Sequence, residues 1–305
     1  MNRGRAVITM ALAGVLAAGL TGVLTACRPP TSGAHTVVTS FYPLYFIAER
    51  VAGRYNDVVD LTPPGVEPHE YELTVRQVAQ IDTARVGFYL SGVAPSVDQA
   101  MANDSPDHVL DVADVVHLAA PVTGSGVEST SDNRDPHFWQ DPVLMQEATT
   151  AFATTMVEAD PRHAAYYRLQ SDRLVRDLRR LDHHFGKGLA SCATRTVVVS
   201  HDAFEYLGRR YHLDIVPIAG LEPDAEPSLQ RLRDLTGLIR DQNVTTIFFE
   251  TLASPALAQS LAGDLGLKTA VLDPIEGLTS SDPHATYLTL MRQNLAALAK
   301  AGDCT

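Results

Sequence analysis

The segment DPRHAAYYRLQSDRLVRDLRRLDHHFGK, residues 160–187, divides the chain into two halves. Asp160 and Pro161 are typical of the cap and first turn of a helix. Apolar residues then recur at spacings of four, three and four, which places them on one helical face. They are Leu174, Leu178, Leu181 and Phe185. A helix over residues 161–188 would span roughly 40 Å, which suits a rigid rod between two lobes.

Strand and helix patterns alternate on both sides of this rod. Short apolar runs predict strands at 36–40, 57–62, 85–90 and 108–112, and then at 196–200, 213–220, 245–250 and 268–273. Helical patterns separate them, and the last helix is predicted to open at Asp282 and run to Lys300. The alternation indicates an α/β fold with parallel sheets, about four strand-helix units in each half. We expect an N-terminal lobe over 36–160 and a C-terminal lobe over 189–305.

The amino terminus is predicted to carry an export signal. The chain has 305 residues with 45% apolar content, enough for two domains with sizeable cores. Residues 1–26 have two arginines and then an uncharged run, which predicts a secretory signal peptide. The run ends in LTAC, which resembles the lipobox of bacterial lipoproteins, so we expect Cys27 to carry lipid and residues 27–35 to form a tether. A transmembrane helix or an ordinary cleaved signal are the alternatives.

The charge and the cysteine content indicate which partners and which covalent bonds to expect. Removal of the signal takes the formal charge from −12 to −14, which argues against nucleic acid as a partner. Cys192 and Cys304 remain after Cys27, and disulfides persist in exported proteins. We predict a bridge between them that joins the two ends of the C-terminal lobe, with two free thiols as the alternative.

Metal-binding side chains occur near the predicted strand ends. His69 lies in PPGVEPHEYEL, His201 follows the predicted strand in VVVSHDAF, and Asp273 begins the loop of AVLDPIEGL. His137 lies in DPHFWQDP, in the last loop before the rod. Ligands of open α/β sheets bind outside the carboxyl ends of the strands, so these four residues are predicted to meet between the lobes. Three imidazoles and one carboxylate favour Zn²⁺ over Mg²⁺ or Ca²⁺.

These four motifs together resemble the metal-specific solute-binding lipoproteins that serve ABC importers of zinc and manganese. The resemblance implies two (β/α)4 lobes joined by one long rigid helix, with the metal held between the lobes and delivered to a membrane permease. It also implies the zinc branch, because manganese members typically have glutamate where this chain has His201. Many zinc members have a His-rich loop before the second histidine, whereas residues 119–134 are polar, contain no histidine and predict a mobile loop.

Several alternatives stay open at this point. Glu250 is expected to orient an imidazole, or else to compete with Asp273 for the fourth ligand position. Phe138 and Trp139 are expected to shield the site. A manganese receptor, a zinc hydrolase with an open coordination position, and an adhesin with a structural metal are the rival functions. The chain has no HExxH or GxSxG motif, so we assign no catalytic residue.

The sequence thus predicts a Zn²⁺ receptor on the extracytoplasmic face of the cell membrane. It would be a monomer, anchored by lipid on Cys27, with an ABC importer permease as its partner and Zn²⁺ as the transported ligand.

Overall fold

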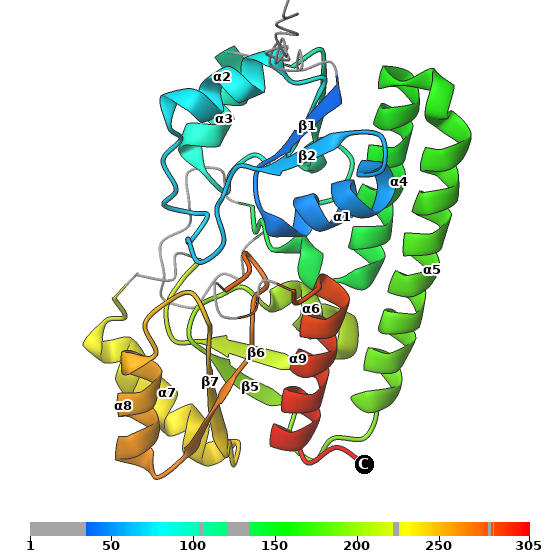
Figure 1. The fold of residues 1–305 in the computed structure, drawn as a ribbon. Helices are drawn as coiled ribbons and strands as arrows, with labels where there is room; N and C mark the ends of the chain where they lie inside the picture. Colours follow the sequence, from blue (N-terminus) through cyan, green and yellow to red (C-terminus); the bar gives the residue numbers. More distant parts are fainter. Residues whose placement is uncertain (1–34, 104–105, 121–133, 222–225, 280–281, 283) are drawn as a thin grey trace, which may run out of the picture. The chain divides into compact units, whose positions relative to one another are not determined.

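The computed structural model describes residues 35–103, 106–120, 134–221, 226–279, 282 and 284–305. It confirms the predicted α/β fold, with two lobes that are each built on a parallel four-stranded sheet (Figure 1). The predicted signal peptide, Cys27 and all but the last residue of the tether lie outside these residues, as do residues 121–133 of the polar loop. Within the described ranges, no helix is both long and apolar enough to cross a membrane.

The N-terminal sheet has the strand order β2-β1-β3-β4. Val37 and Val38 on β1 point to opposite faces of this sheet, as a strand requires. Val38 packs in a buried cluster with Ile81 of α2 and Val97 of α3, whereas Val37 joins the cluster that contains Ile47 of α1. The elements of this lobe are β1 (Thr36–Thr39), α1 (Tyr42–Ala52), β2 (Asp57–Asp60), α2 (Val75–Thr83), β3 (Val86–Tyr89), α3 (Pro95–Asn103), β4 (His108–Asp111), the 3-10 turns η2 (Val112–Asp114) and η3 (Phe138–Gln140), and α4 (Pro142–Ala159).

The C-terminal sheet repeats this arrangement with the order β6-β5-β7-β8. Val198 of β5 packs with Ile239 of α7 and Ala262 of α8, while Val197 and Val199 face the cluster that both lobes share. The elements are β5 (Thr196–Val199), α6 (Glu205–Tyr211), β6 (Asp214–Pro217), α7 (Leu229–Asp241), β7 (Thr246–Phe249), α8 (Ala256–Leu265), β8 (Lys268–Val271) and α9 (Tyr287–Ala301).

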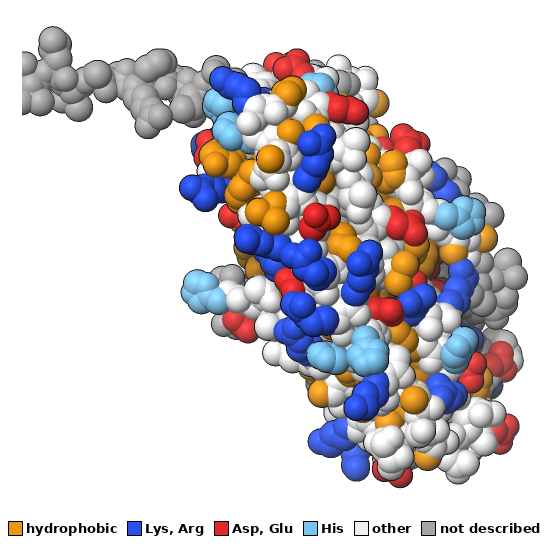
Figure 2. Space-filling view, turned by 90° about the vertical axis from the view of Figure 1, so that its right-hand side faces the viewer, with side chains coloured by type: hydrophobic (Ala, Val, Ile, Leu, Met, Phe, Trp, Pro, Cys, Tyr) orange, Lys and Arg blue, Asp and Glu red, His pale blue; other side chains and the backbone are white. Residues whose placement is uncertain are grey.

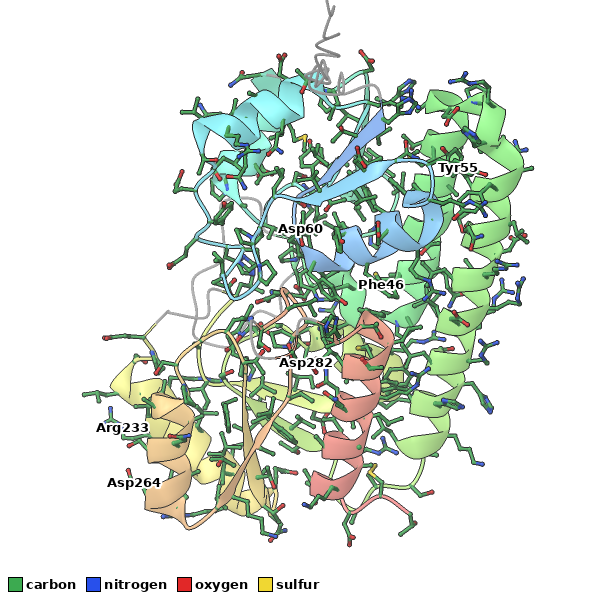
Figure 3. All side chains as sticks on the ribbon, viewed as in Figure 1. Phe46, Tyr55, Asp60, Arg233, Asp264 and Asp282 are labelled. Carbon is green, nitrogen blue, oxygen red and sulfur yellow. A yellow bond between two sulfur atoms is a disulfide. The ribbon has the colours of Figure 1, made fainter. Side chains whose placement is uncertain are left out.

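The predicted rod is one continuous helix. After the 3-10 turn η4 (Pro161–His163), α5 (Ala164–Gly188) packs against α1 and α4 of the first lobe and against α9 of the second. One buried hydrophobic cluster extends along α5 and through both lobes, because it includes residues of α1, α4, α5, α6 and α9. Phe46 of α1 and Tyr287 of α9 also place their ring centroids 5.5 Å apart (Figure 3 labels Phe46). The two lobes therefore contact each other as well as the rod.

Two helices begin at hydroxyl caps, which Thr74 and Ser228 provide. Thr74 accepts a hydrogen bond from the backbone N–H of Gln77, whose side chain bonds back to the N–H of Thr74 and completes a capping box. Ser228 accepts in the same way from the N–H of Arg231. Both caps fix the point where a loop at the carboxyl end of a sheet turns into a helix.

The last helix begins later than predicted. α9 begins at Tyr287, capped by Thr286, and Asp282 instead donates its N–H to the carbonyl oxygen of Thr279 in a turn. Thr286 and Thr289 exchange two side-chain to backbone hydrogen bonds, a capping box that an aspartate at 282 does not form. This start also buries Tyr287 completely against the shared core.

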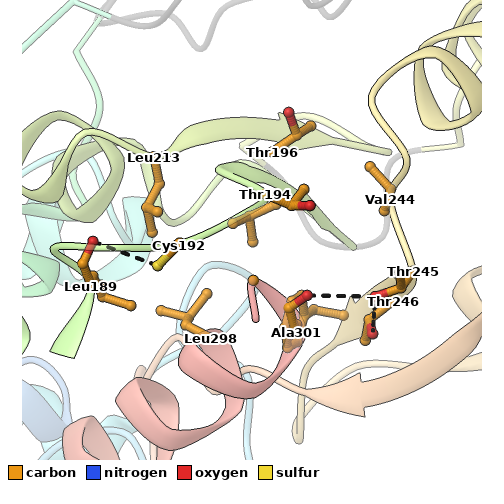
Figure 4. A pocket seen from close by; sticks show the side chains of 13 residues that line it. Leu189, Cys192, Thr194, Thr196, Leu213, Val244, Thr245, Thr246, Leu298 and Ala301 are labelled. Atoms are coloured by element: carbon orange, nitrogen blue, oxygen red, sulfur yellow. Dashed lines mark hydrogen bonds between the residues drawn. The ribbon is translucent and has the colours of Figure 1, made fainter. Parts of the chain in front are cut away.

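The predicted disulfide is present. Cys192 and Cys304 are bonded across 112 residues, and their backbones form an isolated antiparallel bridge. Figure 4 shows Cys192 close to Leu189, with Leu298 of α9 and Leu213 nearby, around a small cavity of about 10 Å³. The bond therefore joins the residues that precede β5 to those that follow α9.

Candidate metal centre

Four buried side chains from four loops meet between the two lobes. His69 lies in the loop between β2 and α2, and His137 immediately precedes η3. His201 follows β5, and Glu276 follows β8. Each of the four side chains is at most 2% exposed. Each lobe thus contributes two of them, and all come from the carboxyl side of the sheets.

The three imidazoles converge on one carboxylate oxygen. The Nε2 atoms of His69, His137 and His201 lie 3.6, 3.1 and 3.4 Å from Oε1 of Glu276. The ring centroid of His137 lies 5.5 Å from that of His69 and 5.6 Å from that of His201. Among the described residues, the buried Nε2 atoms of His69 and His201 make no hydrogen bond. Buried imidazole nitrogens that lie close together and lack hydrogen-bond partners are suited to bind a metal ion.

Carboxylates behind two of the rings hold them in this orientation. Nδ1 of His137 lies 2.8 Å from Oδ1 of Asp135, and Nδ1 of His201 lies 2.9 Å from Oε1 of Glu250. Ser200 donates its hydroxyl to the same Glu250 oxygen at 2.7 Å. A proton shared at Nδ1 leaves the Nε2 lone pair free to face the centre, as in metal sites where a carboxylate orients a ligating histidine.

The site carries opposed charges in close contact. Burial lowers the pKa of His137, but its hydrogen bonds to Asp135 and Glu276 outweigh this and raise the pKa to about 9. Burial raises the pKa of Glu276, yet the hydrogen bond with His137 and the close approach of the other two imidazoles hold this pKa well below its usual range. Burial and the charge of Glu276 raise the pKa of Glu67 to about 9. A cation that binds here must therefore displace the proton that His137 holds at neutral pH.

A backbone reversal brings Glu276 into the centre. Ile275 has φ of 62°, a left-handed conformation that branched residues rarely adopt. The carboxylate of Asp273 accepts the N–H of Ile275 at 2.8 Å and so stabilises this turn. Asn294 of α9 bonds both the N–H and the carbonyl oxygen of Asp273, at 2.9 and 2.7 Å. The loop after β8 therefore points Glu276, three residues beyond Asp273, at the histidines.

Asp273, the predicted fourth ligand, lies outside the groups of described side chains that are close enough to share a metal. Its Oδ1 is engaged by Ile275 and its Oδ2 accepts from the hydroxyl of Thr251 at 3.2 Å. The groups of side chains close enough to share a metal are His69, His137 and Glu276, and His201, Glu250 and Glu276. Glu276 was within the quoted motif DPIEGL. An isoleucine gives no indication of a left-handed turn, so the sequence alone favours the carboxylate nearest the strand.

The motif DPHFWQDP supports this loop as well as providing His137. Trp139 donates its indole N–H to the carbonyl oxygen of Pro274 at 2.7 Å, and the side-chain amide of Gln140 bonds the same oxygen. Trp139 also packs against the His137 ring, with centroids 5.1 Å apart, and is fully buried together with Phe138. Both aromatic residues exclude water, and Trp139 additionally fixes the backbone beside Glu276.

Comparison with known proteins assigns the chain to a family. The family model described as ZnuA, zinc-uptake complex component A periplasmic, matches residues 37–301. The chain belongs to this family. Its sequence is 34% identical over 273 residues to the high-affinity zinc uptake system protein ZnuA of Bacillus subtilis, covering 86% of each chain. It is 32% identical over 293 residues to the zinc-binding lipoprotein AdcA of Streptococcus pneumoniae, of which it spans 58% of the length.

Solved structures agree with this ZnuA-family fold. The Zn(II)-bound ZnuA-like domain of Streptococcus pneumoniae AdcA has a TM-score of 0.74 at 32% identity, with 88% of this chain and 98% of that chain covered. The laminin-binding protein Lmb of Streptococcus agalactiae, described as a bifunctional protein with adhesin and metal transporting activity, has a TM-score of 0.77 at 29% identity, with 88% and 98% covered.

Proposed function

We propose that this ZnuA-family chain binds Zn²⁺ through His69, His137, His201 and Glu276 and delivers the ion to an ABC-type importer. The observation that carries the proposal is the convergence of three Nε2 atoms, within 3.6 Å, on one oxygen of Glu276. Those side chains are far apart in sequence and are buried between two lobes. Such an arrangement is costly unless a cation occupies it, because it places several ionisable groups away from water.

The donor set favours Zn²⁺ over other common divalent ions. Three imidazole nitrogens and one carboxylate oxygen match the tetrahedral coordination of zinc, whereas Mg²⁺ and Ca²⁺ prefer six or more oxygens. Four protein ligands also leave no open position for a water molecule. A catalytic zinc site keeps that position for chemistry, so a closed shell supports binding and carriage over hydrolysis.

Relatives support the transport role. The B. subtilis relative is named as part of a high-affinity zinc uptake system, and the family description places its members in a zinc-uptake complex. We infer that this chain serves the same step, with an importer permease as its partner. Zinc uptake by cells that lack the chain should recover when the wild-type gene is returned and stay low when the Glu276→Gln variant is returned.

The amino-terminal sequence supports a proposal for the cellular location. We infer that residues 1–26 are removed, that Cys27 carries the lipid, and that residues 27–35 tether a monomeric receptor to the outer face of the cell membrane. The receptor would comprise the lobes at 36–160 and 189–305 with the connecting helix at 161–188. The lipoprotein name of the pneumococcal relative supports this assignment. Metabolic labelling with a fatty acid, compared between wild type and Cys27→Ser, tests it.

The decisive experiment is a zinc titration of two matched variants. Glu276→Gln keeps the shape of the side chain and removes its charge, so zinc affinity should fall by more than about 100-fold, beyond the loss expected for an outer partner. Asp273→Asn keeps the oxygen that accepts from Ile275 and should cost less than about tenfold. The reverse order of the two losses would refute the proposed ligand set.

A further inference from the structure

The strongest feature outside the metal centre is a concentration of positive charge on α5. The chain has a formal charge of −12, yet residues 161–188 contain seven of its 24 basic residues and only three acidic ones. This one segment therefore has a formal charge of +4, and the remainder of the chain has −16. Figure 2 views the molecule from the right-hand side of Figure 1, where α5 lies. Lysine and arginine side chains are gathered on this face.

Helical spacing places most of these charges on the face opposite the core. The buried residues of α5 are Tyr167, Ser171, Leu174, Leu178, Leu181 and Phe185. The residues on the opposite side recur at spacings of three, four and seven and are all exposed. We call them the outer ridge, and they are Arg162, Leu169, Arg173, Arg176, Arg180 and Lys187. A ridge of this length extends over about 38 Å of helix and surface turn.

The acidic residues of α5 do not neutralise the outer ridge. Of the three acidic residues of α5, Asp177 and Asp182 are only partly exposed and bind other groups as well, namely Arg50 and Arg210. The third, Asp172, is exposed and forms no ion pair with any described residue. Arg180 does contact Asp177. Within the described part of the chain, the side chains of Arg173, Arg176 and Lys187 form neither a hydrogen bond nor an ion pair. The ridge thus keeps uncompensated charge at its surface.

The described chain starts near one end of this ridge. The carbonyl oxygen of Thr36 accepts the N–H of Arg85 at 2.9 Å, and Nη1 of Arg85 lies 3.6 Å from Asp160, two residues before Arg162. Eight residues, 28–35, lie between Cys27 and Thr36, and this stretch can span at most about 30 Å when extended. A lipid on Cys27 would therefore keep the ridge within reach of the membrane surface.

We propose that the outer ridge of α5 docks on an anionic phospholipid surface while the chain is anchored by its lipid. This inference rests on the proposed lipid anchor. Arginine and lysine close to an anionic leaflet are attracted to it, and the attraction is local because salt screens charges beyond about 8–10 Å. The acidic remainder of the chain is thus largely screened from the contact. In Figure 1, α5 lies on the side away from α2, α3, α7 and α8, so docking leaves that side uncovered.

The test uses the full lipidated chain in two kinds of vesicle. One kind contains phosphatidylcholine alone, and the other contains equal parts of phosphatidylcholine and phosphatidylglycerol. The chain has three lysines, of which Lys187 lies on the ridge and Lys268 and Lys300 lie in the C-terminal lobe at β8 and α9. Acylation of Lys187 should slow by about threefold or more on the anionic vesicles, and high salt should remove the effect. The reactivity of Lys268 should not change.

Matched variants separate charge from structure. Replacement of Arg173, Arg176 and Arg180 by glutamate should abolish the protection of Lys187, whereas replacement by lysine should keep it. Glutamate at the exposed Arg76, Arg233 and Arg240 makes the same change in net charge away from α5 and should leave the protection intact (Figure 3 labels Arg233 on α7).

Equal reactivity of Lys187 on the two kinds of vesicle would overturn the proposal, as would protection that survives the glutamate substitutions on the ridge. Retention of the chain on phosphatidylcholine vesicles reports the anchor, and zinc titration reports the metal centre. A failure of either is therefore distinguishable from the result at Lys187.

Discussion

The indole N–H of Trp139 donates to the carbonyl oxygen of Pro274 at 2.7 Å and joins two segments that are 135 residues apart in sequence. One segment carries His137 and the other carries Glu276. This hydrogen bond therefore couples the segment of His137 to the loop that carries the proposed carboxylate ligand. The carbonyl oxygen of Trp139 in turn accepts the hydroxyl of Tyr287 on α9 at 2.5 Å. The precision of the metal centre depends on this buried network.

Trp139→Phe should weaken zinc binding without unfolding the protein. The phenyl ring keeps most of the packing against His137 but loses the bond that holds Pro274. We expect zinc affinity to fall by about 10-fold to 100-fold, the usual cost of losing an outer partner of a metal site. Competition with a chelator of known affinity measures it. Tyr167→Phe is the control, because it also removes a buried hydrogen bond, from the hydroxyl to Asp160, far from the site. An equal loss of affinity in both variants would contradict this role for Trp139.

Glu250→Gln should also reduce zinc affinity by about 10-fold to 100-fold. The substitution removes the negative charge that orients the His201 ring through Nδ1. Glu205→Gln is a matched control, since Glu205 on α6 lies near Arg209, at 3.9 Å, and contacts none of the three imidazoles. Calorimetric titration of both variants measures the difference. Unchanged affinity in Glu250→Gln would show that His201 needs no carboxylate behind it.

Asp160→Asn should lower the free energy of unfolding by about 1–3 kcal/mol at neutral pH. Burial raises the pKa of Asp160, but hydrogen bonds from His163 and Tyr167 outweigh it and lower this pKa below its usual value. A carboxyl whose pKa is lowered by folding stabilises the protein above its unfolded pKa, near 4, and loses this contribution as the pH falls further.

The difference in the free energy of unfolding between wild type and Asp160→Asn should therefore have its full value at pH 7 and decrease below about pH 4. Urea unfolding at several pH values measures it. Asp172→Asn, at an exposed position of α5, should have little effect throughout. A difference that grows toward low pH would reverse the predicted sign.

Loss of the disulfide should destabilise the C-terminal lobe. The bond closes 112 residues, for which the chain-entropy model gives a contribution of about 4–5 kcal/mol. Replacement of both Cys192 and Cys304 by alanine should lower the urea midpoint accordingly. Zinc affinity of the folded variant should stay within about twofold of wild type, because no ligand contacts the bond. A urea midpoint equal to that of wild type would show that the bond stabilises nothing.

The fold could be predicted because its signals are local. Runs such as TVVT at 36–39 and TVVV at 196–199 become buried parallel strands, and Thr74 and Ser228 cap the helices that follow their loops. The start of α9 could not be predicted in this way. Asp282 and Thr286 are both acceptable caps by residue type, and the burial of Tyr287 decides between them.

The three histidines of the candidate site could be located because loops at the carboxyl ends of parallel strands converge. The fourth group could not, because its position depends on the φ of 62° at Ile275 and on bonds to Asn294 and Trp139 from distant segments. Asp273 and Glu276 are chemically equivalent in the sequence. Only tertiary structure shows that one stabilises the turn and the other faces the imidazoles.

A crystal structure of the zinc-loaded chain tests the ligand set most directly. We predict one ion with Nε2 of His69, His137 and His201 at about 2.0–2.1 Å and an oxygen of Glu276 at about 2.0–2.2 Å. Asp273 should still accept the N–H of Ile275. An ion bound by Asp273 in place of Glu276, or one that completes its shell with water, would contradict the account.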